Sequence, residues 1–261
     1  SFRLASMRLA PVQCVAAGHP TTTGLSTIDY FLSAAAAEPA DASSHYTERL
    51  VALPGMGVCM PLPALPRQRK TRADFGLEPQ QIIYLSTQGL FKHLPVHDAL
   101  YARIAGCVDN AVFVFVEGHY PAWTRIFRER LKRTFESRGL SPERHLRFVP
   151  RQDYDAYLCL NSVSDVFLDP PGGWSGGMTV RDALASGLPV LTLPGTLMRT
   201  RQGYGLLTEL GIRDTIASDL DSYVDLAVQI GNDVKLRASI SQRIRERSHI
   251  LFDDSRGVAG L

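Results

Sequence analysis

The sequence predicts an α/β protein, built on a Rossmann-like parallel sheet with helices on both faces. Short, continuous apolar runs such as 82–85 and 111–116 are typical of strands that are buried on both faces. Stretches with helical spacing separate these runs, which favours strand–helix–strand units with right-handed crossovers. No repeat of 20–50 residues is visible, so a helical-repeat scaffold is not expected.

Residues 1–70 are predicted to form a first, less regular unit. We expect short strands over 8–14, 29–32 and 49–53, and a small-residue loop or broken helix over 34–37. Prolines then cluster, which prevents regular structure and predicts a linker; they are Pro54, Pro61, Pro63 and Pro66. The basic run from Arg67 to Lys70 is interpreted as a solvated tether, with a role facing phosphate as the alternative.

Residues 71–261 are predicted to form the second, regular unit. The expected strands are 82–85, 111–116, 146–149, 166–168 and 189–193. The expected helices are 96–104, 123–138, 154–160, 179–185, 202–210, 220–230 and 234–247. Since the carboxyl ends of parallel strands meet at one edge, a ligand is expected in the crevice beyond those ends.

Composition excludes several classes of protein. The 261 residues contain 28 Lys and Arg against 26 Asp and Glu, a net charge of +2, so no nucleic-acid partner is expected. No apolar run approaches the roughly 20 residues of a membrane-spanning helix. The four cysteines form no C-x-x-C pair, and no leader is visible, which predicts reduced thiols in a cytoplasmic protein. The sequence begins with Ser1 and is interpreted as a piece of a longer chain.

The loop from Asp169 to Asp182 is the first candidate site, because it joins a buried strand to a helix. Gly176 and Gly177 allow close approach of a ligand, and the helix N-terminus offers free N–H groups to a phosphate or diphosphate. Hydroxyl donors and a carboxylate for ribose hydroxyls follow at Ser175, Thr179 and Asp182. A glycine-rich turn with a capped helix and no ligand remains the alternative. The motif is neither G-x-G-x-x-G nor Walker A, which argues against dinucleotide and P-loop chemistry.

Two further strand ends are predicted to face the same crevice. Lys92 follows the 82–85 strand, in a loop that includes Gln88, and would reach a phosphate as a point charge. Pro150 and Arg151 follow the 146–149 strand, where a backbone group would contact a nucleobase and Arg151 would stack on it. An exposed lysine, an exposed arginine and a strand-ending proline are the alternatives.

The histidines give one candidate of a different kind. His19 lies in a hydroxyl-rich turn and is a candidate acid, base or phosphate donor; a locally satisfied turn histidine is the alternative. His93 and His97 have the i, i+4 spacing of metal ligands, but no third ligand accompanies them and Pro95 lies between them. No metal site is expected.

Several motifs, in collinear order over nearly the whole chain, resemble the O-linked N-acetylglucosamine transferase and SPINDLY-like family, including the bacterial cytoplasmic adhesin N-glycosyltransferases. They are residues 9–14, 18–20, 28–30, 176–184, 187–195, 201–203 and 251–253.

The resemblance implies a GT-B architecture, with this chain holding the end of the N-terminal lobe, the linker and the C-terminal lobe. By position it implies that Lys92 and Thr179 contact the donor diphosphate, with Gly176 and Gly177 in the loop before Thr179. Asp182 would hold the ribose, and Pro150 and Arg151 would contact uracil.

Three positions depart from the family pattern. Met178 replaces a usual hydroxyl. Asp155 falls near a usual histidine, where a carboxylate would repel a diphosphate. His19 is matched by tyrosine in some members, which argues against an obligatory base.

The implied function is an inverting glycosyltransferase that moves a hexose or N-acetylglucosamine from a UDP-sugar to an acceptor polypeptide, without a cofactor or metal. Two alternatives remain: a related enzyme acting on a glycan or small molecule, and a non-catalytic UDP-binding module. The sequence does not choose between Ser/Thr and Asn acceptors.

Overall fold

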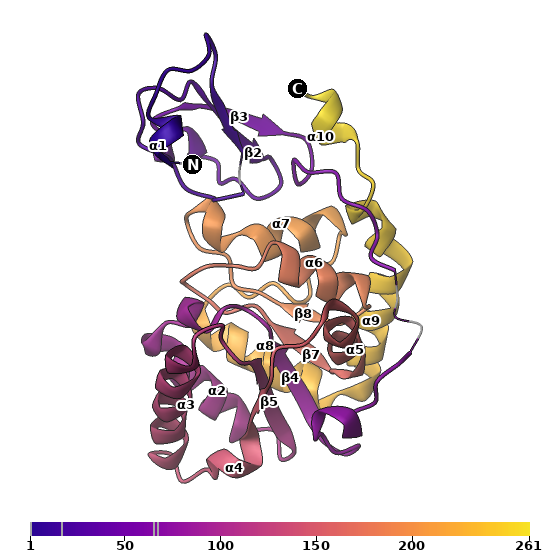
Figure 1. The fold of residues 1–261 in the computed structure, drawn as a ribbon. Coiled ribbons are helices and arrows are strands. Elements are labelled where there is room, and N and C mark those ends of the chain that lie inside the picture. Colours follow the sequence, from indigo (N-terminus) through magenta and orange to yellow (C-terminus); the bar gives the residue numbers. More distant parts are fainter. Residues whose placement is uncertain (1, 17, 65, 67) are drawn as a thin grey trace.

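The computed structural model describes residues 2–16, 18–64, 66 and 68–261. It contains two parallel sheets, one of three strands and one of five, that lie at opposite ends of the molecule with the helices of the second unit between and around them (Figure 1). The described residues between Pro54 and Lys70 form no helix or strand and connect the two parts. Arg67, in the predicted basic run, lies outside the described residues, and Arg69 and Lys70 are exposed.

The first sheet has the order β1-β2-β3, with all strands parallel. These strands are β1 (Cys14–Ala16), β2 (Tyr30–Ala34) and β3 (Arg49–Leu53), preceded by the short helix α1 (Phe2–Ala5). The strand predicted over 8–14 is wrong, because β1 starts only at Cys14. Arg8 instead pairs with Asp29, and Asp29 Oδ2 accepts the Gln13 backbone N–H at 2.8 Å, so polar contacts hold this segment as a turn.

The second sheet has the order β6-β5-β4-β7-β8, also fully parallel. Its strands are β4 (Ile82–Ser86), β5 (Ala111–Val116), β6 (Leu146–Val149), β7 (Val166–Leu168) and β8 (Val190–Leu191). The chain moves outward from β4 to β6, then returns to add β7 on the other side of β4. Such a reversal creates a crevice at the carboxyl ends of the two central strands, β4 and β7.

Helices cover both faces of this sheet, as the sequence predicts. They are α2 (Asp98–Ala105), α3 (Pro121–Glu136), α4 (Pro142–His145), α5 (Tyr154–Val163), α6 (Met178–Ala185), α7 (Gln202–Glu209), α8 (Leu220–Asn232) and α9 (Val234–Arg247). Helix α2 packs against α3 and α8 on one side, and α6 packs against α5 and α9 on the other (Figure 1). The last helix, α10 (Arg256–Ala259), returns to the first sheet.

The core between α2, α3 and the second sheet is rich in aromatic rings. Phe113, Phe115, Phe127 and Phe135 are all buried, and their ring centroids lie 5.0–6.0 Å apart in edge-to-face pairs. Such pairs add to the free energy gained from burial of apolar area. This core makes the second sheet a rigid support for the loops that leave its edge.

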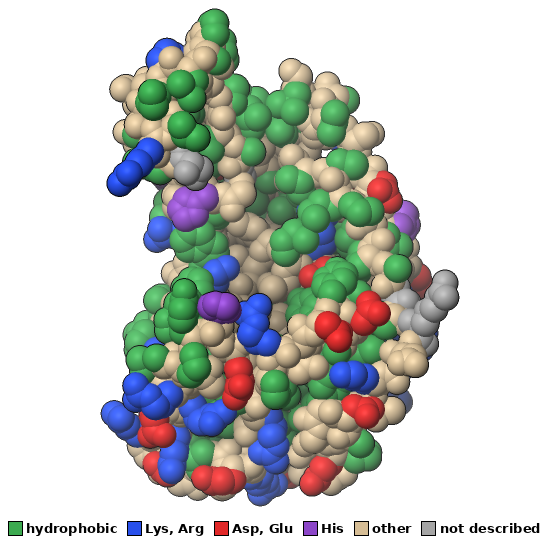
Figure 2. All heavy atoms as spheres, in the orientation of Figure 1, with side chains coloured by type: hydrophobic (Ala, Val, Ile, Leu, Met, Phe, Trp, Pro, Cys, Tyr) green, Lys and Arg blue, Asp and Glu red, His purple; other side chains and the backbone are tan. Residues whose placement is uncertain are grey.

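The space-filling view shows a hollow between the end that holds the first sheet and the end that holds the second (Figure 2). It lies on the side of the second sheet to which the carboxyl ends of its strands point.

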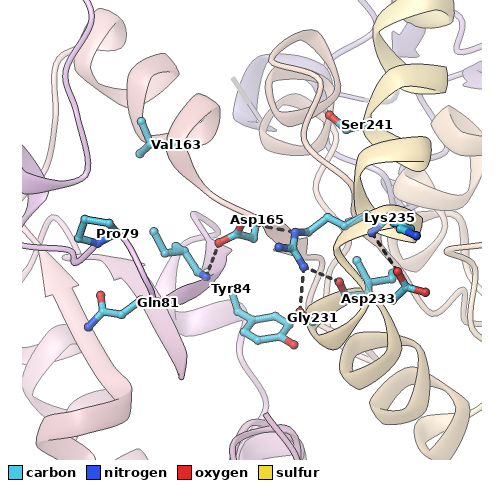
Figure 3. A network of polar contacts seen from close by, with 12 residues as sticks. Pro79, Gln81, Tyr84, Val163, Asp165, Gly231, Asp233, Lys235 and Ser241 are labelled. Carbon is cyan, nitrogen blue, oxygen red and sulfur yellow. Dashed lines mark hydrogen bonds and ion pairs between the residues drawn. The ribbon is translucent and has the colours of Figure 1, made fainter. Parts of the chain in front are cut away.

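An ion-pair network centred on Asp165, just before β7, lies at the amino ends of the strands of the second sheet (Figure 3). The Asp165 carboxylate pairs with Arg72 at 2.9 Å and with Arg237 at 3.4 Å. The same carboxylate accepts the Ile83 N–H at 2.8 Å, and Arg237 donates to the last carbonyls of α8, among them that of Gly231. The network joins the start of the second unit, two central strands and α9 on the side away from the hollow.

Candidate functional site

Two loops meet at the crevice between β4 and β7. The Gln88 Nε2 amide, in the loop after β4, donates to Thr179 Oγ1 on α6 at 2.8 Å. The Lys92 ammonium donates to Gln88 Oε1 at 3.2 Å. The structure therefore brings together Lys92, Gln88 and Thr179, which the sequence places 91 residues apart at most. A Cβ on Gly176 would overlap the side chains of Gln88 and Thr179, so only glycine fits beneath this chain of contacts.

A cavity of about 320 Å³ opens above these loops, between the two sheets. Its polar wall is formed by Gln88, Lys92, Ser175, Thr179, Arg181 and Gln202. Its apolar wall comes from both parts of the molecule: Pro20, Ala34, Met56, Val58, Met60, Trp174, Met178 and Met198. The volume lies within the range of small-molecule sites, and apolar walls with a few convergent polar groups are typical of them.

Two cations line this cavity, Lys92 and Arg181, and Arg181 donates to the Leu251 carbonyl. Burial lowers the pKa of the Lys92 ammonium, while the negative charge of Asp169 opposes that shift. An ammonium has three N–H donors, and the contact with Gln88 uses one of them. Two donors are left to bind an anion in the cavity.

The loop between β7 and α6, residues 169–177, is called the glycine loop. Two of its donors do not point to a ligand, as the sequence predicts, but to the protein itself. Ser175 Oγ donates to Asp169 Oδ2 at 2.6 Å, and the Gly176 N–H donates to Asp169 Oδ1 at 2.8 Å. Both groups therefore bind a carboxylate of the protein itself, although Ser175 lines the cavity. The N–H groups of the first turn of α6, together with the Thr179 hydroxyl, are the loop's donors for a phosphate.

A second hollow includes Arg151 in its wall, and Asp182 is bonded to another residue of that wall, Tyr154. The hollow has about 330 Å³ and is lined by Thr87, Val116, Arg151, Gln152, Tyr154 and Tyr157. Tyr154 donates its hydroxyl to Asp182 Oδ1 at 3.0 Å, and burial raises the pKa of the Asp182 carboxyl. Pro150 is exposed, and its carbonyl accepts the side-chain amide of Gln152, a residue of the hollow, at 2.6 Å.

The sequence analysis missed the two tyrosines of this second hollow. Tyr154 and Tyr157 are three residues apart and so lie on the same face of α5. Their rings are nearly parallel, with centroids 6.1 Å apart. Aromatic residues three apart on a helix that follows a strand end were the available signal. Planar rings beside Arg151 form a surface on which a nucleobase can stack.

His19 reaches the cavity from the first part of the chain. Its exposed ring lies 5.4 Å from that of Trp174, and its neighbours Gly18 and Pro20 line the cavity. The Trp174 indole also contacts two cations, with Lys92 Nζ at 5.7 Å and Arg199 Cζ at 5.9 Å from its ring centroid. Trp174, which the sequence analysis did not select, is thus the point at which the glycine loop meets the first unit.

Two of the three departures from the family pattern, Met178 and Asp155, lie in different places. Met178 is half exposed at the start of α6 and lines the cavity, where its thioether replaces a hydroxyl donor. Asp155 is exposed and lines a separate hollow beside Lys70 and Asp74. Its carboxylate is therefore not among the groups that line the cavity, and the expected repulsion of a diphosphate does not follow from its position.

Within the described ranges, no three His, Cys, Asp or Glu residues are grouped so as to hold a metal ion. His93 is buried, where its Nδ1 bonds the Tyr101 hydroxyl at 2.8 Å. In these ranges, no helix has both the length and the apolar character needed to cross a bilayer.

Two parallel sheets facing a shared cavity, with a lysine and a glycine loop at the reversal point of the larger sheet, define a protein of the GT-B class. The sequence profile of glycosyl transferase family 41 matches residues 67–257. The chain belongs to this family.

Curated relatives and solved structures agree with this assignment. A protein from Arabidopsis thaliana named probable UDP-N-acetylglucosamine–peptide N-acetylglucosaminyltransferase SPINDLY is 30% identical over 244 residues, covering 92% of this chain and 26% of the relative. The tomato (Solanum lycopersicum) protein of the same name is 28% identical over 253 residues, covering 92% of this chain and 25% of the relative. The chain thus spans about a quarter of these relatives' length.

Among solved structures, a mutant O-GlcNAc transferase from Thermobaculum terrenum superposes with a TM-score of 0.82 at 26% identity. The match covers 96% of this chain and 46% of that one. Sucrose-phosphate synthase from Thermosynechococcus elongatus shares the fold, with a TM-score of 0.66 at 18% identity, over 89% of this chain and 56% of that one.

Proposed function

We propose that this chain carries the donor-binding part of an inverting glycosyltransferase, which transfers a hexose or N-acetylglucosamine from a UDP-sugar to protein side chains. The contact chain Lys92–Gln88–Thr179 carries the proposal, because it directs a cation, an amide and a hydroxyl to one point at the carboxyl ends of β4 and β7. Membership of family 41 and the printed names of the relatives support a UDP-sugar donor and a peptide acceptor.

In the proposed reaction, a hydroxyl or amide of the acceptor forms a bond to the anomeric carbon as the bond from that carbon to the diphosphate breaks. The acceptor loses a proton, and UDP leaves with the electron pair. Lys92 and the first turn of α6 would stabilise the charge that develops on the leaving diphosphate. One preorganised donor of this kind contributes about 2.7–4 kcal/mol to transition-state stabilisation where it has been measured.

The remaining residues are assigned by their place around the cavity. Asp182, Tyr154 and Arg151 would hold the ribose and the nucleobase in the second hollow. His19 comes from the first unit, lies against Trp174 of the glycine loop, and stays our candidate for the acceptor's proton. A cytoplasmic location is part of the same proposal.

Titration calorimetry with UDP tests donor binding. Lys92→Ala is expected to weaken UDP binding at least about 10-fold with the fold intact, because it removes the only cation that the proposal places on the diphosphate. Lys235→Ala, at an exposed position of α9, is the matched control and is expected to bind as the unmodified chain does. No UDP binding by the unmodified chain would contradict the proposal.

Mass spectrometry of proteins co-expressed with the full-length protein tests transfer. An added hexose or N-acetylhexosamine on protein side chains is expected, and it would also identify the sugar and the acceptor residue. UDP binding without any transfer would favour a non-catalytic binding module. Transfer to glycans but not to peptides would favour the related small-molecule or glycan enzyme.

We also expect transfer to continue in EDTA. Lys92 and the helix N-terminus supply the positive potential that a divalent cation would otherwise give to the diphosphate. Activity measured with and without excess EDTA should agree within about twofold. Loss of activity that Mg²⁺ or Mn²⁺ restores would contradict metal-independent transfer.

A further inference from the structure

Asp169, at the end of β7, is a buried acid for which the proposed reaction has no direct use. Its side chain is only 1% exposed, yet it accepts three hydrogen bonds. The donors are Ser175 Oγ at 2.6 Å, Gly176 N–H at 2.8 Å and Thr192 Oγ1 at 2.8 Å. They come from the glycine loop and from the residue after β8, so one carboxylate joins the loop to two strands.

The hydrogen-bond network around Asp169 continues to α7 through Ser175. Ser175 Oγ, while donating to Asp169, accepts the Gly203 N–H at 2.8 Å. A Cβ on Gly203 would lie 2.6 Å from Asp169 Oδ2, so α7 approaches the carboxylate as closely as its backbone allows. The start of α7 is therefore tied to the glycine loop through Ser175 and Asp169.

These contacts determine where the phosphate donors of the loop point. Gly176 is held by Asp169, and the two residues that follow it, Gly177 and Met178, begin α6. Thr179 is then only three residues from an anchored backbone amide. Loss of the anchor removes one of the two contacts that orient the first turn of α6 toward Lys92, and leaves the contact of Gln88 with Thr179.

We propose that Asp169 is a positioning residue for the donor diphosphate: as a carboxylate, it fixes the glycine loop so that the first turn of α6 and Thr179 face Lys92. The inference rests on the proposed function, because it assumes that the cavity binds UDP. Asp169 does not touch the ligand itself; its effect is exerted through Gly176 and Ser175.

The ionised form is required because it alone accepts from all three donors with both oxygens. Burial raises the pKa of the Asp169 carboxyl to about 6, while its hydrogen bonds and the charge of Lys92 act in the opposite direction. The other titratable groups that face it are Tyr101 on α2 and Tyr223 on α8, whose hydroxyl donates to the Asp169 carbonyl. Burial raises the pKa of both phenols, so neither changes charge near neutral pH.

UDP titration of Asp169→Asn tests the inference. At about pH 7.5 we expect Asp169→Asn to bind UDP roughly 10-fold more weakly than the unmodified chain. At about pH 5.5 we expect the difference to fall to about threefold, because the Asp169 carboxyl of the unmodified chain is then largely protonated. The titration of UDP itself is common to both chains and cancels in the ratio. Asp221→Asn removes an exposed carboxylate and is the matched control.

Thr192→Val keeps the charge and removes one of the three donors. Because that hydrogen bond favours the ionised carboxylate, its loss should move the pH midpoint of UDP affinity upward. A purely structural role would lower the melting temperature of both variants without changing the pH profile. Equal UDP affinity of Asp169→Asn and the unmodified chain at pH 7.5, or an unmoved midpoint in folded Thr192→Val, would overturn the inference. If the unmodified chain binds no UDP at any pH, it is the proposed function that fails.

Discussion

At the scale of single residues, His93 shows how the rigid core restricts charge. The imidazole is packed against Phe115 and Phe127, and among the described residues its Nε2 has no hydrogen-bond partner. Burial, with the nearby charge of Arg130, lowers the pKa of His93 to about 3. The folded protein therefore holds this ring neutral at pH values where the unfolded chain protonates it.

This difference predicts destabilisation by mild acid. The folded pKa of His93 lies below the unfolded value of 6.5, so the folded state loses stability as the pH falls from about 6.5 toward about 3. From pH 8 to pH 5 the free energy of unfolding should fall by about 2 kcal/mol from this group alone. Urea denaturation at the two pH values measures it. His93→Gln should remove this contribution, so the free energy of unfolding should fall by about 2 kcal/mol less than in the unmodified chain, and His249→Gln, at an exposed position, should keep it.

Sequence reasoning found the residues of the site that follow a recognisable strand end, and missed those defined by burial. Lys92 and Thr179 follow strands whose carboxyl ends the apolar pattern places at one edge of the sheet. Asp169 precedes two prolines and two glycines and reads as part of a loop, since only the fold shows that its carboxylate is enclosed. Ser175 was assigned to phosphate because its partner, Asp169, is not evident from spacing.

At the scale of the elements, the regular second unit was predictable because its strands are continuous apolar runs. The first unit was harder to predict: the sequence predicts a strand over 8–14, but hydrogen bonds to Asp29 hold residues 8–13 outside the sheet. Strand β8 has two residues rather than five, because Thr192 leaves the ladder and bridges to Ile216. Neither contact can be read from local pattern.

The Asp165 network gives a prediction for these elements. Asp165 is enclosed, with 13% of its side chain exposed, and its partners Arg72 and Arg237 come from separate segments. Asp165→Ala should destabilise the fold by about 3 kcal/mol or more, since it leaves two partly buried guanidinium groups without their charge partner. Chemical denaturation measures the loss. Asp221→Ala, which breaks an exposed pair with Arg103, should cost less than about 1 kcal/mol; equal losses would refute the argument.

At the scale of the whole molecule, the C-terminal segment ties the two parts together. The Asp253 N–H donates to the Met60 carbonyl at 2.7 Å, and Gly257 of α10 packs against Gly57, where a Cβ would lie 3.0 Å from the Gly57 carbonyl carbon. Close packing of backbone on backbone leaves no room for a larger residue at Gly257.

Gly257→Val should therefore detach α10 from the first unit. We expect faster hydrogen exchange at the amides of β2 and β3 and of the segment near Gly57, with little change in the second sheet, because that sheet keeps its own core. Val258→Ala changes the neighbouring, 60% exposed side chain and is the control. Unchanged exchange in β3 would show that α10 contributes nothing to holding the first sheet.

The chain passes between its two parts twice, once near Met60 and once near Asp253, and Figure 1 shows both passages on the same side. Because a hydrogen bond couples these passages, we expect them to act together as one hinge between the two parts. The cavity lies between this hinge, through Met56 and Met60, and the contact of His19 with Trp174. We therefore expect bending to separate the imidazole from the indole and to open a route for substrates.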